Sequence, residues 1–515
     1  MVDNPVDELM TSKGIDYEAF EERVREERDF VVEHLEAGTF DNPQSTIGLE
    51  YEFYAADADN GSIRRIHRSL LDFLGFETEL GLHNAEVTTG VHPATAAGFD
   101  AIAAEVEAKL SATEAWATDH RVQLVSDGMW TIGPDDHSAA SYLFEANHEE
   151  GLILAINVSN AVRYHGFAST ERALATEIDV PGVSLQADNS GPVSLTTSIQ
   201  PHYQVERAAD LPRHFNYALR VAGPLLALGV NSPLFPPELY DETDRETVLE
   251  AAWAENRIPV YEQMMKPVDG PTKVRFPRDL ERVTDAVDRI VGDYVIVPAS
   301  IEAGQRFDDE FVHLRHKHGS YWRWVRPVFD GGSEAAANAR LEFRPLPGQP
   351  TLADTMAFLA AFAGLMTALP TADHPVADLP WERAEENFYA AARDGMDADV
   401  QWITAAGERT DDLGRCLDDL LDAASDGLER RGLSPERAAA WLEPLRDRVR
   451  RERTPAGWKR AQTAMRLDEG ASLTEAIHGM QRAYLAHQRE TFFDGSFATW
   501  PDASREGLSA SASPR

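Results

Sequence analysis

Two glutamates lie two residues apart within residues 47–54, where their carboxylates could hold a positively charged ligand. The segment reads IGLEYEFY, and its apolar side chains fall at every second position. This alternation predicts a β-strand that carries Glu50 and Glu52 together on the opposite face. Carboxylates about 7 Å apart along one strand repel each other, and glutamate is disfavoured in strands. We therefore expect this pair to bind a cation.

Three further segments alternate in the same way, at residues 84–89, 196–205 and 340–344. Their polar positions are Asn84, Glu86, Thr88, Thr196, Ser198, Gln200, His202, Gln204, Arg340, Glu342 and Arg344. Carboxylates are natural ligands of Mg²⁺, and arginine forks match phosphate oxygens. A sheet with one face in water gives the same alternation and is the simpler interpretation of any single strand. Four such strands together favour a ligand-binding face, because solvated strands usually carry Thr, Ser and Lys.

Other segments predict the elements that position these strands. Residues 16–37 form a helix with Asp16 as its N-cap, and a longer helix follows at 94–120. A strand at 122–125 and a helix at 212–228 come next, and residues 351–492 are mainly helical. Pro201 interrupts the strand that carries His202, which requires an edge strand or a bulge.

The composition limits the classes of function. The chain has 515 residues and a formal charge of −39, with 87 acidic against 48 basic residues, which argues against nucleic acid or an anionic membrane as partner. Only six of the basic residues are lysines, and such an acidic, lysine-poor surface is typical of proteins from very salty cytoplasm. The single cysteine, Cys416, excludes an internal disulfide. Without an apolar run of 18 residues or a signal peptide, the expected location is the cytoplasm.

Several short motifs, in order along the chain, resemble the glutamate–cysteine ligase superfamily, in particular its carboxylate–amine ligase branch. They are GLEYEF at 48–53, EVTT at 86–89, IQPHYQ at 199–204, LGVNSP at 228–233, WVRP at 324–327, LEFR at 341–344 and ENFYAAARDGM at 386–396. The resemblance implies an α+β fold with a saddle-shaped antiparallel sheet related to that of glutamine synthetase, flanked by helices. It covers a catalytic domain at 46–400. The residue patterns predict a helical segment at 1–45 and a helical extension at 401–499, and the composition predicts a disordered tail at 500–515.

The resemblance implies that ATP and Mg²⁺ bind on the concave face of this sheet. The implied metal ligands are Glu50, Glu52, Glu86, Glu342, His202 and Glu79, of which His202 could instead adjoin a phosphate. The implied catalytic residues are Arg344, Glu342 and Arg326, and both arginines would also contact the nucleotide, as would His202.

Three lysines and an arginine between the strands of His202 and Glu342 suggest a further contribution to anion binding. Lys266, Lys273, Lys317 and Arg275 remain there in a chain that otherwise avoids lysine. Ordinary surface lysines are an equally good interpretation.

The predicted function is phosphorylation of a carboxylate, preferably the γ-carboxylate of glutamate, followed by attack of an amine, preferably cysteine. A phosphotransferase on the same sheet, and a homologue that binds nucleotide without turnover, remain as alternatives. The expected partners are small-molecule substrates, and a homo-oligomer is compatible with the sequence.

Overall fold

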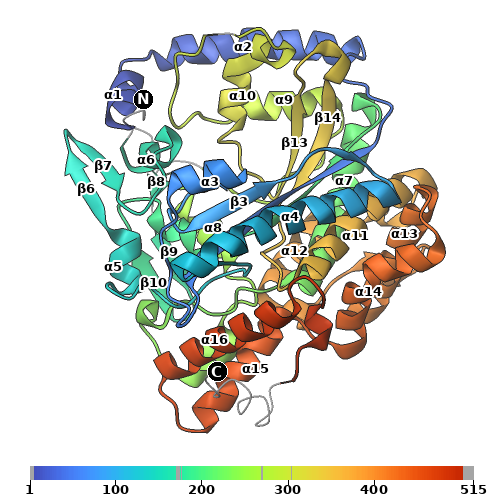
Figure 1. Cartoon of the computed structure of the whole chain (residues 1–515). Coiled ribbons are helices and arrows are strands. Elements are labelled where there is room, and N and C mark those ends of the chain that lie inside the picture. Colours follow the sequence, from blue (N-terminus) through green and yellow to red (C-terminus); the bar gives the residue numbers. More distant parts are fainter. Residues whose placement is uncertain (1–4, 170–173, 176, 268–270, 303, 503–515) are drawn as a thin grey trace.

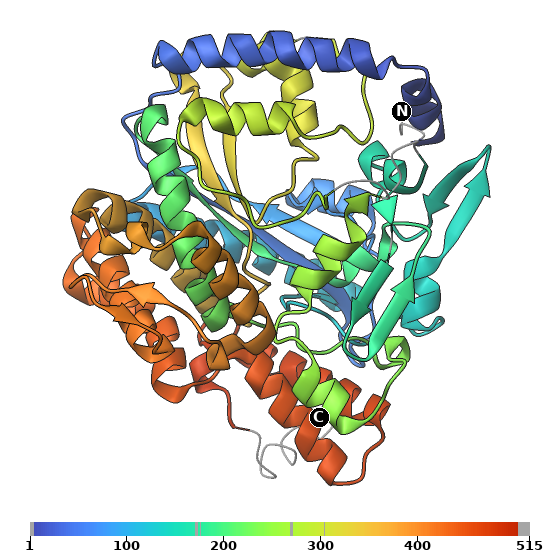
Figure 2. The same ribbon diagram turned by 180° about the vertical axis from the view of Figure 1, so that it is seen from behind.

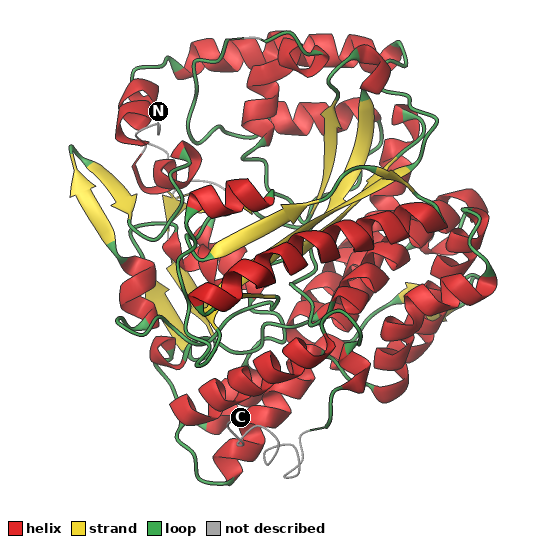
Figure 3. Cartoon of the chain, viewed as in Figure 1, coloured by secondary structure: helices red, strands yellow, loops and turns green. Residues whose placement is uncertain are grey.

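A curved antiparallel sheet runs through the centre of the protein and is surrounded by helices (Figures 1 and 3). The computed structural model describes residues 5–169, 174–175, 177–267, 271–302 and 304–502. The main path of the sheet is, in order, β13 (Val325–Asp330), β14 (Asn338–Phe343), β11 (Ile199–Gln204), β1 (Thr46–Asp57), β3 (Asn84–Thr88) and β2 (Glu77–Thr78). Two more strands, β4 (His92–Pro93) and β5 (Val122–Val125), also pair with β1. The predicted α+β class and antiparallel sheet are confirmed.

The register of the strands brings the predicted polar positions onto one face. Glu52 lies opposite Glu86, and His202 lies opposite both Gly48 and Glu342. The other face carries the apolar positions and packs on two helices, α7 (Leu211–Gly229) and α11 (Leu352–Ala372). Phe343 of β14, for example, stacks on a phenylalanine of α11 with ring centroids 4.5 Å apart.

The polar face is buried as well. Glu52, Glu86 and Glu342 are only 5%, 8% and 2% exposed. A sheet with one face in water would leave these side chains accessible, so that alternative is wrong. Burying several carboxylates without compensation is costly, which means that this face must be matched by cations or protons.

Pro201 lies in an interior strand, and a bulge in the segment that follows β14 accommodates it. Residues 202–204 of β11 pair with residues 342–340, whereas Ser198 bridges to Pro347. The β14 side therefore has four residues, 343–346, opposite the three residues 199–201. One extra residue on one strand is the definition of a bulge, and here it removes the need for a ladder hydrogen bond from the proline nitrogen.

Helices close both ends of the sheet. At one end α2 (Tyr17–Glu36) lies across α9 (Val283–Val291) and α10 (Val312–His318), and Figure 2 shows α9 beneath it. Asp16 caps α2 as predicted, accepting the Glu18 N–H at 2.8 Å.

The remaining elements include α1 (Pro5–Lys13), α3 (Arg68–Leu74), α4 (Ala96–His120), α5 (Ala139–Phe144), α6 (Val162–Ser169), α8 (Arg257–Met264) and α12 (Trp381–Asp394). Small two-stranded sheets pair β6 (Ala146–Glu149) with β7 (Leu152–Ala155), β9 (Glu177–Val180) with β10 (Val183–Gln186), β8 (Leu174–Ala175) with β12 (Lys266–Pro267), and β15 (Trp402–Ile403) with β16 (Arg409–Thr410).

Four C-terminal helices pack directly on the rest of the protein. They are α13 (Leu413–Arg430), α14 (Pro435–Arg451), α15 (Pro455–Asp468) and α16 (Leu473–Thr491). Both α13 and α14 cover α11, which is long and apolar enough to cross a membrane but is 94% buried over its most apolar window. From α15, the buried Lys459 forms an ion pair with the buried Asp127. The C-terminal helices therefore complete the core.

The chain beyond α16 turns back onto this core. Trp500 is 2% exposed and packs against Trp458 and Tyr484, with ring centroids 5.2 and 4.9 Å away. The sequence analysis placed Trp500 in the tail, and its burial corrects that assignment. Residues 503–515 lie outside the described residues.

Candidate active site

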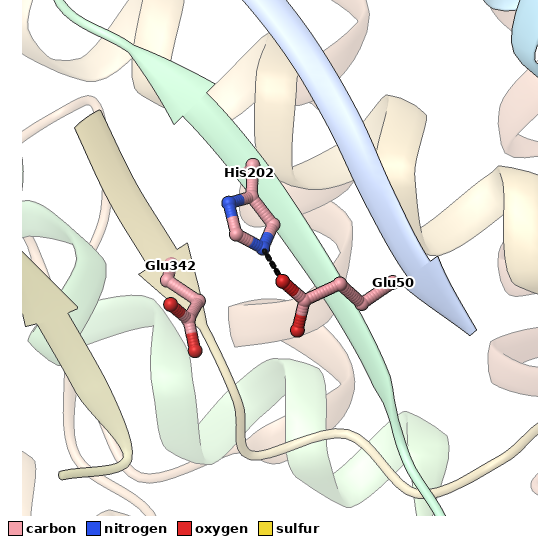
Figure 4. A group of neighbouring side chains, drawn as sticks. All are labelled: Glu50, His202 and Glu342. Atoms are coloured by element: carbon pink, nitrogen blue, oxygen red, sulfur yellow. Dashed lines mark ion pairs between the residues drawn. The ribbon is translucent and has the colours of Figure 1, made fainter. Parts of the chain in front are cut away.

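The first cluster of potential ligands joins three neighbouring strands. One ligand atom from each of Glu50, His202 and Glu342 lies within 4.8 Å of the others, and Figure 4 shows the three side chains converging. Nε2 of His202 is 3.3 Å from a carboxylate oxygen of Glu50. This nitrogen is buried and, apart from its ion pair with Glu50, has no hydrogen-bond partner among the described residues. An unpartnered imidazole nitrogen facing two carboxylates is suited to a metal ion.

A second cluster lies beside the first, across β1 and β3. Glu52, Glu79 and Glu86 each offer a carboxylate oxygen within 4.8 Å of the other two. Glu52 is held in place by the hydroxyl of Ser198 at 2.8 Å and the amide of Gln200 at 2.9 Å. The sheet register therefore creates two adjacent groups of ligands.

Two arginines adjoin the first cluster. Arg326 donates from Nε to Glu342 at 2.8 Å, and Arg344 forms an ion pair with the same carboxylate. Arg344 also donates to the side-chain oxygen of Gln200 at 2.6 Å, and its main-chain N–H donates to the carbonyl of Trp324 at 2.9 Å. The two guanidinium groups are thus fixed on the polar face, where they could bind phosphate oxygens.

The two clusters differ in how their negative charge is balanced. Burial raises the pKa of Glu342, but Arg326 and Arg344 outweigh it and hold that pKa well below its usual range. In the second cluster burial dominates and neighbouring carboxylates add to it. The pKa of Glu52 rises to about 7, and that of Glu86 stands well above its usual value. The first cluster stays charged, whereas the second favours protons until a cation arrives.

These residues fit a hard divalent cation. Mg²⁺ prefers carboxylate oxygens and is often bound together with the phosphates of a substrate. A divalent ion would relieve the repulsion that raises the pKa of Glu86, and the first cluster provides the unpartnered nitrogen of His202. The donor set therefore agrees with the Mg²⁺ site implied by the sequence.

The cavity next to Glu50 and His202 extends along β11 and β14. Its volume is about 190 Å³. It is lined by Thr46, Gln204, Asp330, Asn338 and Arg340, among others. Amide, hydroxyl and guanidinium groups therefore continue from the first cluster and could hold the polar parts of a nucleotide.

Four cleft residues come from helices and were not predicted from the sequence. They are Arg257 and Tyr261 of α8, and Arg163 and Tyr164 of α6. Arg257, at the start of α8, is 2% exposed and lies over the rings of Tyr261 and Trp324, 5.3 and 5.2 Å from their centroids. Arg163 of α6 donates to the hydroxyl of Tyr164 at 3.0 Å. The charges of Glu52 and Glu79 both act on Tyr261, so the second cluster lies nearby. Strand alternation could not find these residues, and we see no other sequence signal for them.

Lys273 was predicted to contribute to the nucleotide site, and the structure corrects this prediction. Its ammonium group is fully buried and donates to Asp293 at 2.8 Å and to the carbonyl of Tyr294. Lys317 is likewise buried in an ion pair, with Glu21 at 2.5 Å. Both ammonium groups are buried and already paired with carboxylates, so neither is available to bind a phosphate.

Lys266 and Arg275 are not brought to the polar face either. Lys266 is exposed on β12, opposite Ala175 of β8. Arg275 lines a different pocket, and the charges that act on it belong to Arg323 and Asp293. The structure therefore brings together the predicted ligands Glu50, Glu52, Glu79, Glu86, His202 and Glu342 with Arg326 and Arg344, and leaves these other cations outside.

Comparison with known proteins agrees with this geometry. A family model described as glutamate–cysteine ligase family 2 matches residues 46–486. The fold resembles that of a glutamate–cysteine ligase from Francisella tularensis in complex with AMP, at 13% identity and a TM-score of 0.50 over 92% of each chain. None of the curated proteins matches the sequence.

Two further solved structures show weaker similarity. A bifunctional glutathione synthetase from Pasteurella multocida is 13% identical, with a TM-score of 0.46 over 90% of this chain and 55% of that one. The ligase PafA, in complex with the prokaryotic ubiquitin-like protein Pup, is 10% identical, with a TM-score of 0.41 over 92% and 80%.

Proposed function

The chain belongs to glutamate–cysteine ligase family 2, and from this premise we propose that it uses ATP to join the γ-carboxylate of glutamate to an amine, with cysteine favoured. The family supports the general class of reaction, the ligation of a carboxylate to an amine. The observation that carries the proposal is the position of Glu342, which lies beside His202 and Glu50 and pairs with both Arg326 and Arg344. Metal ligands and phosphate-binding cations then share one buried face.

The reaction has two steps, because a carboxylate is a poor electrophile. An oxygen of the γ-carboxylate attacks the γ-phosphorus of ATP, and the bond to the bridging oxygen breaks, which releases ADP. The amine nitrogen then attacks the acyl carbon, the bond to the phosphate oxygen breaks, and the proton lost by nitrogen passes to phosphate or water. Such transfers depend mainly on positioning and charge stabilisation.

Each part of the cleft has a role in this proposal. Arg344 and Arg326 neutralise the transferring phosphoryl group, and Gln200 keeps Arg344 in position. Glu50, His202, Glu342, Glu52, Glu79 and Glu86 would hold Mg²⁺, which when bound would neutralise the phosphates. Arg257 and Arg163 provide cations beside the second cluster for the α-carboxylate of glutamate. The polar cavity along β11 and β14 would take part of the nucleotide.

An ADP-release screen tests the function. The protein is incubated in molar KCl with Mg·ATP and glutamate, alone and with each common amino acid or polyamine. We expect ADP and phosphate to be released together only when the correct amine is present, and the Glu342→Gln variant to release neither. Release of ADP into a stable phosphorylated product, independent of any amine, would instead indicate a phosphotransferase. Nucleotide binding without ADP release under any condition would indicate a non-catalytic homologue.

A further inference from the structure

A second pocket, of about 740 Å³, lies between α9, α12 and the segment that precedes α9. Its lining includes four arginines, Arg275, Arg278, Arg289 and Arg323, and the aromatic side chains of Tyr321 and Trp381. None of these residues belongs to the two carboxylate clusters. A concentration of arginines is unusual in a chain whose formal charge is −39.

Three of these arginines have no carboxylate partner within 4 Å among the described residues: Arg275, Arg278 and Arg289. They are nevertheless held in place. Arg275 donates to the carbonyl of Thr272 at 2.6 Å, and Arg289 donates to the carbonyls of Arg278 and Asp279. The guanidinium of Arg278 lies 4.0 Å from the ring centroid of Trp381. Their positions are fixed by neutral groups, and none of the three forms an ion pair with a described carboxylate.

Three of the four acidic residues that line the pocket, all aspartates, pair with cations outside its lining. Asp285 binds the guanidinium of Arg282 at 3.1 Å, and Asp288 binds Arg28 at 2.8 Å. Asp293 binds the buried Lys273, also at 2.8 Å, and reaches Arg323 at 3.5 Å. One further acid, Glu385, also lines the pocket; burial raises its pKa and the nearby charge of Arg278 lowers it. Because the three aspartates already pair with outside cations, the arginines that lack an ion pair give the pocket a positive character.

A row of aromatic side chains separates this pocket from the active site. Trp324 lies under Arg257 on the active-site side and contacts Phe388, with ring centroids 5.9 Å apart. Phe388 in turn contacts Phe276, at 4.9 Å, and Phe276 lines the pocket. A ligand in the pocket would therefore have its own set of contacts, independent of the carboxylate clusters.

We propose that this pocket binds a small organic or inorganic polyanion that carries two or more carboxylate or phosphate groups. Arginine binds both groups through paired N–H donors, and arginines on different segments that lack an ion-pair partner would each take one acidic group. Tyr321 also lines the pocket, so its hydroxyl can add a donor. The volume suits a small metabolite and is too small for a macromolecular partner.

Calorimetric titration tests the proposal with two probes, citrate for carboxylates and inorganic pyrophosphate for phosphates. Both are titrated without Mg²⁺ at a fixed 0.5 M KCl, so that ionic strength stays constant. We expect saturable binding of at least one probe, and an affinity at least tenfold lower in the Arg278→Gln/Arg289→Gln double variant. If that variant does not fold, as judged by circular dichroism, the single variant Arg275→Gln replaces it.

Two controls locate the binding. Arg415→Gln removes an exposed arginine that is not part of the pocket lining, and Arg344→Lys alters the active site. Both should bind the probe as the unmodified protein does. The proposal is wrong if neither probe shows saturable binding, if the pocket variants bind with unchanged affinity, or if Arg344→Lys abolishes binding, because the probe would then occupy the active site. None of these outcomes depends on the proposed ligase activity.

Discussion

Glu52 and Glu86 lie directly opposite each other on neighbouring antiparallel strands, and both are buried. Like charges in this arrangement destabilise a strand pair. Glu79 adds a third carboxylate to the same cluster. The strands that form the active site are therefore stable only when protons or a cation reduce this charge, and this couples metal binding to the stability of the sheet.

The first prediction concerns this coupling. Glu86→Gln removes one charge and resembles the protonated form that burial and neighbouring carboxylates favour. In EDTA the variant should melt at or above the temperature of the unmodified protein, and the increase in Tm produced by Mg·ATP should fall to less than half. Glu77→Gln is the matched control, because Glu77 lies opposite Glu86 on β2 but is exposed. A full thermal shift in Glu86→Gln would mean that Glu86 does not bind the metal.

The second prediction concerns the planar fork of Arg344. Arg344→Lys keeps the positive charge but loses the paired donors that contact Glu342 and Gln200 and would meet the transferring phosphate. Turnover should fall by about a hundredfold or more, which corresponds to roughly 2.7 kcal/mol of barrier. Steady-state kinetics measure this loss, and an unchanged melting temperature shows that the fold is intact. Normal turnover in a folded variant would remove Arg344 from the mechanism.

The third prediction concerns the buried ion pair between Lys459 and Asp127. Lys459→Met leaves the carboxylate of Asp127 buried without its cation, and this should lower the free energy of unfolding by about 3–5 kcal/mol. Urea denaturation measures the change. The Lys459→Met/Asp127→Leu double variant should recover a large part of the loss, since no unpaired charge remains. Equal stability of the single and double variants would show that the pair does not act as a unit.

The fourth prediction concerns acid. Burial lowers the pKa of His83 from 6.5 to about 4, and its ring lies between the hydroxyl of Tyr142 and the carbonyl of Ser194. As the pH falls, the imidazole of His83 therefore takes up a proton in the unfolded chain before it does so in the folded protein, and its contribution lowers the free energy of unfolding below about pH 6.5. Between pH 7 and pH 5 the contribution of this single group is about 2 kcal/mol. Urea denaturation measures the free energy of unfolding at pH 7 and at pH 5. The change between the two pH values should be smaller in His83→Asn than in the unmodified protein by that amount.

The fifth prediction follows from the net charge of −39. Self-repulsion destabilises the folded state at low ionic strength, and salt screens it. Melting followed by circular dichroism should therefore give a higher Tm in 2 M KCl than in 0.1 M KCl. An unchanged Tm would rule out adaptation to a salty cytoplasm.

The strand alternation located most of the site because a period of two determines which side chains share a face, whatever else the fold contains. It predicted that Glu50, Glu86, His202 and Glu342 would lie together. It could not predict Arg257, since a residue at the start of a helix reaches the cleft only through tertiary packing. Lys273 was misassigned for another reason: a chain that avoids lysine retains one equally well for a buried ion pair as for a ligand.

The burial of α11 also constrains how the protein is made. This helix is apolar enough to cross a membrane, and α13 and α14 pack over it. The second of these two helices ends at Arg451. At about 5–20 residues per second, a ribosome that has completed α11 needs several more seconds to synthesise α13 and α14. During this interval α11 lacks part of its cover, and exposed apolar surface on an incomplete chain favours aggregation. The order of the elements along the chain therefore makes α13 and α14 protect a helix that was made well before them.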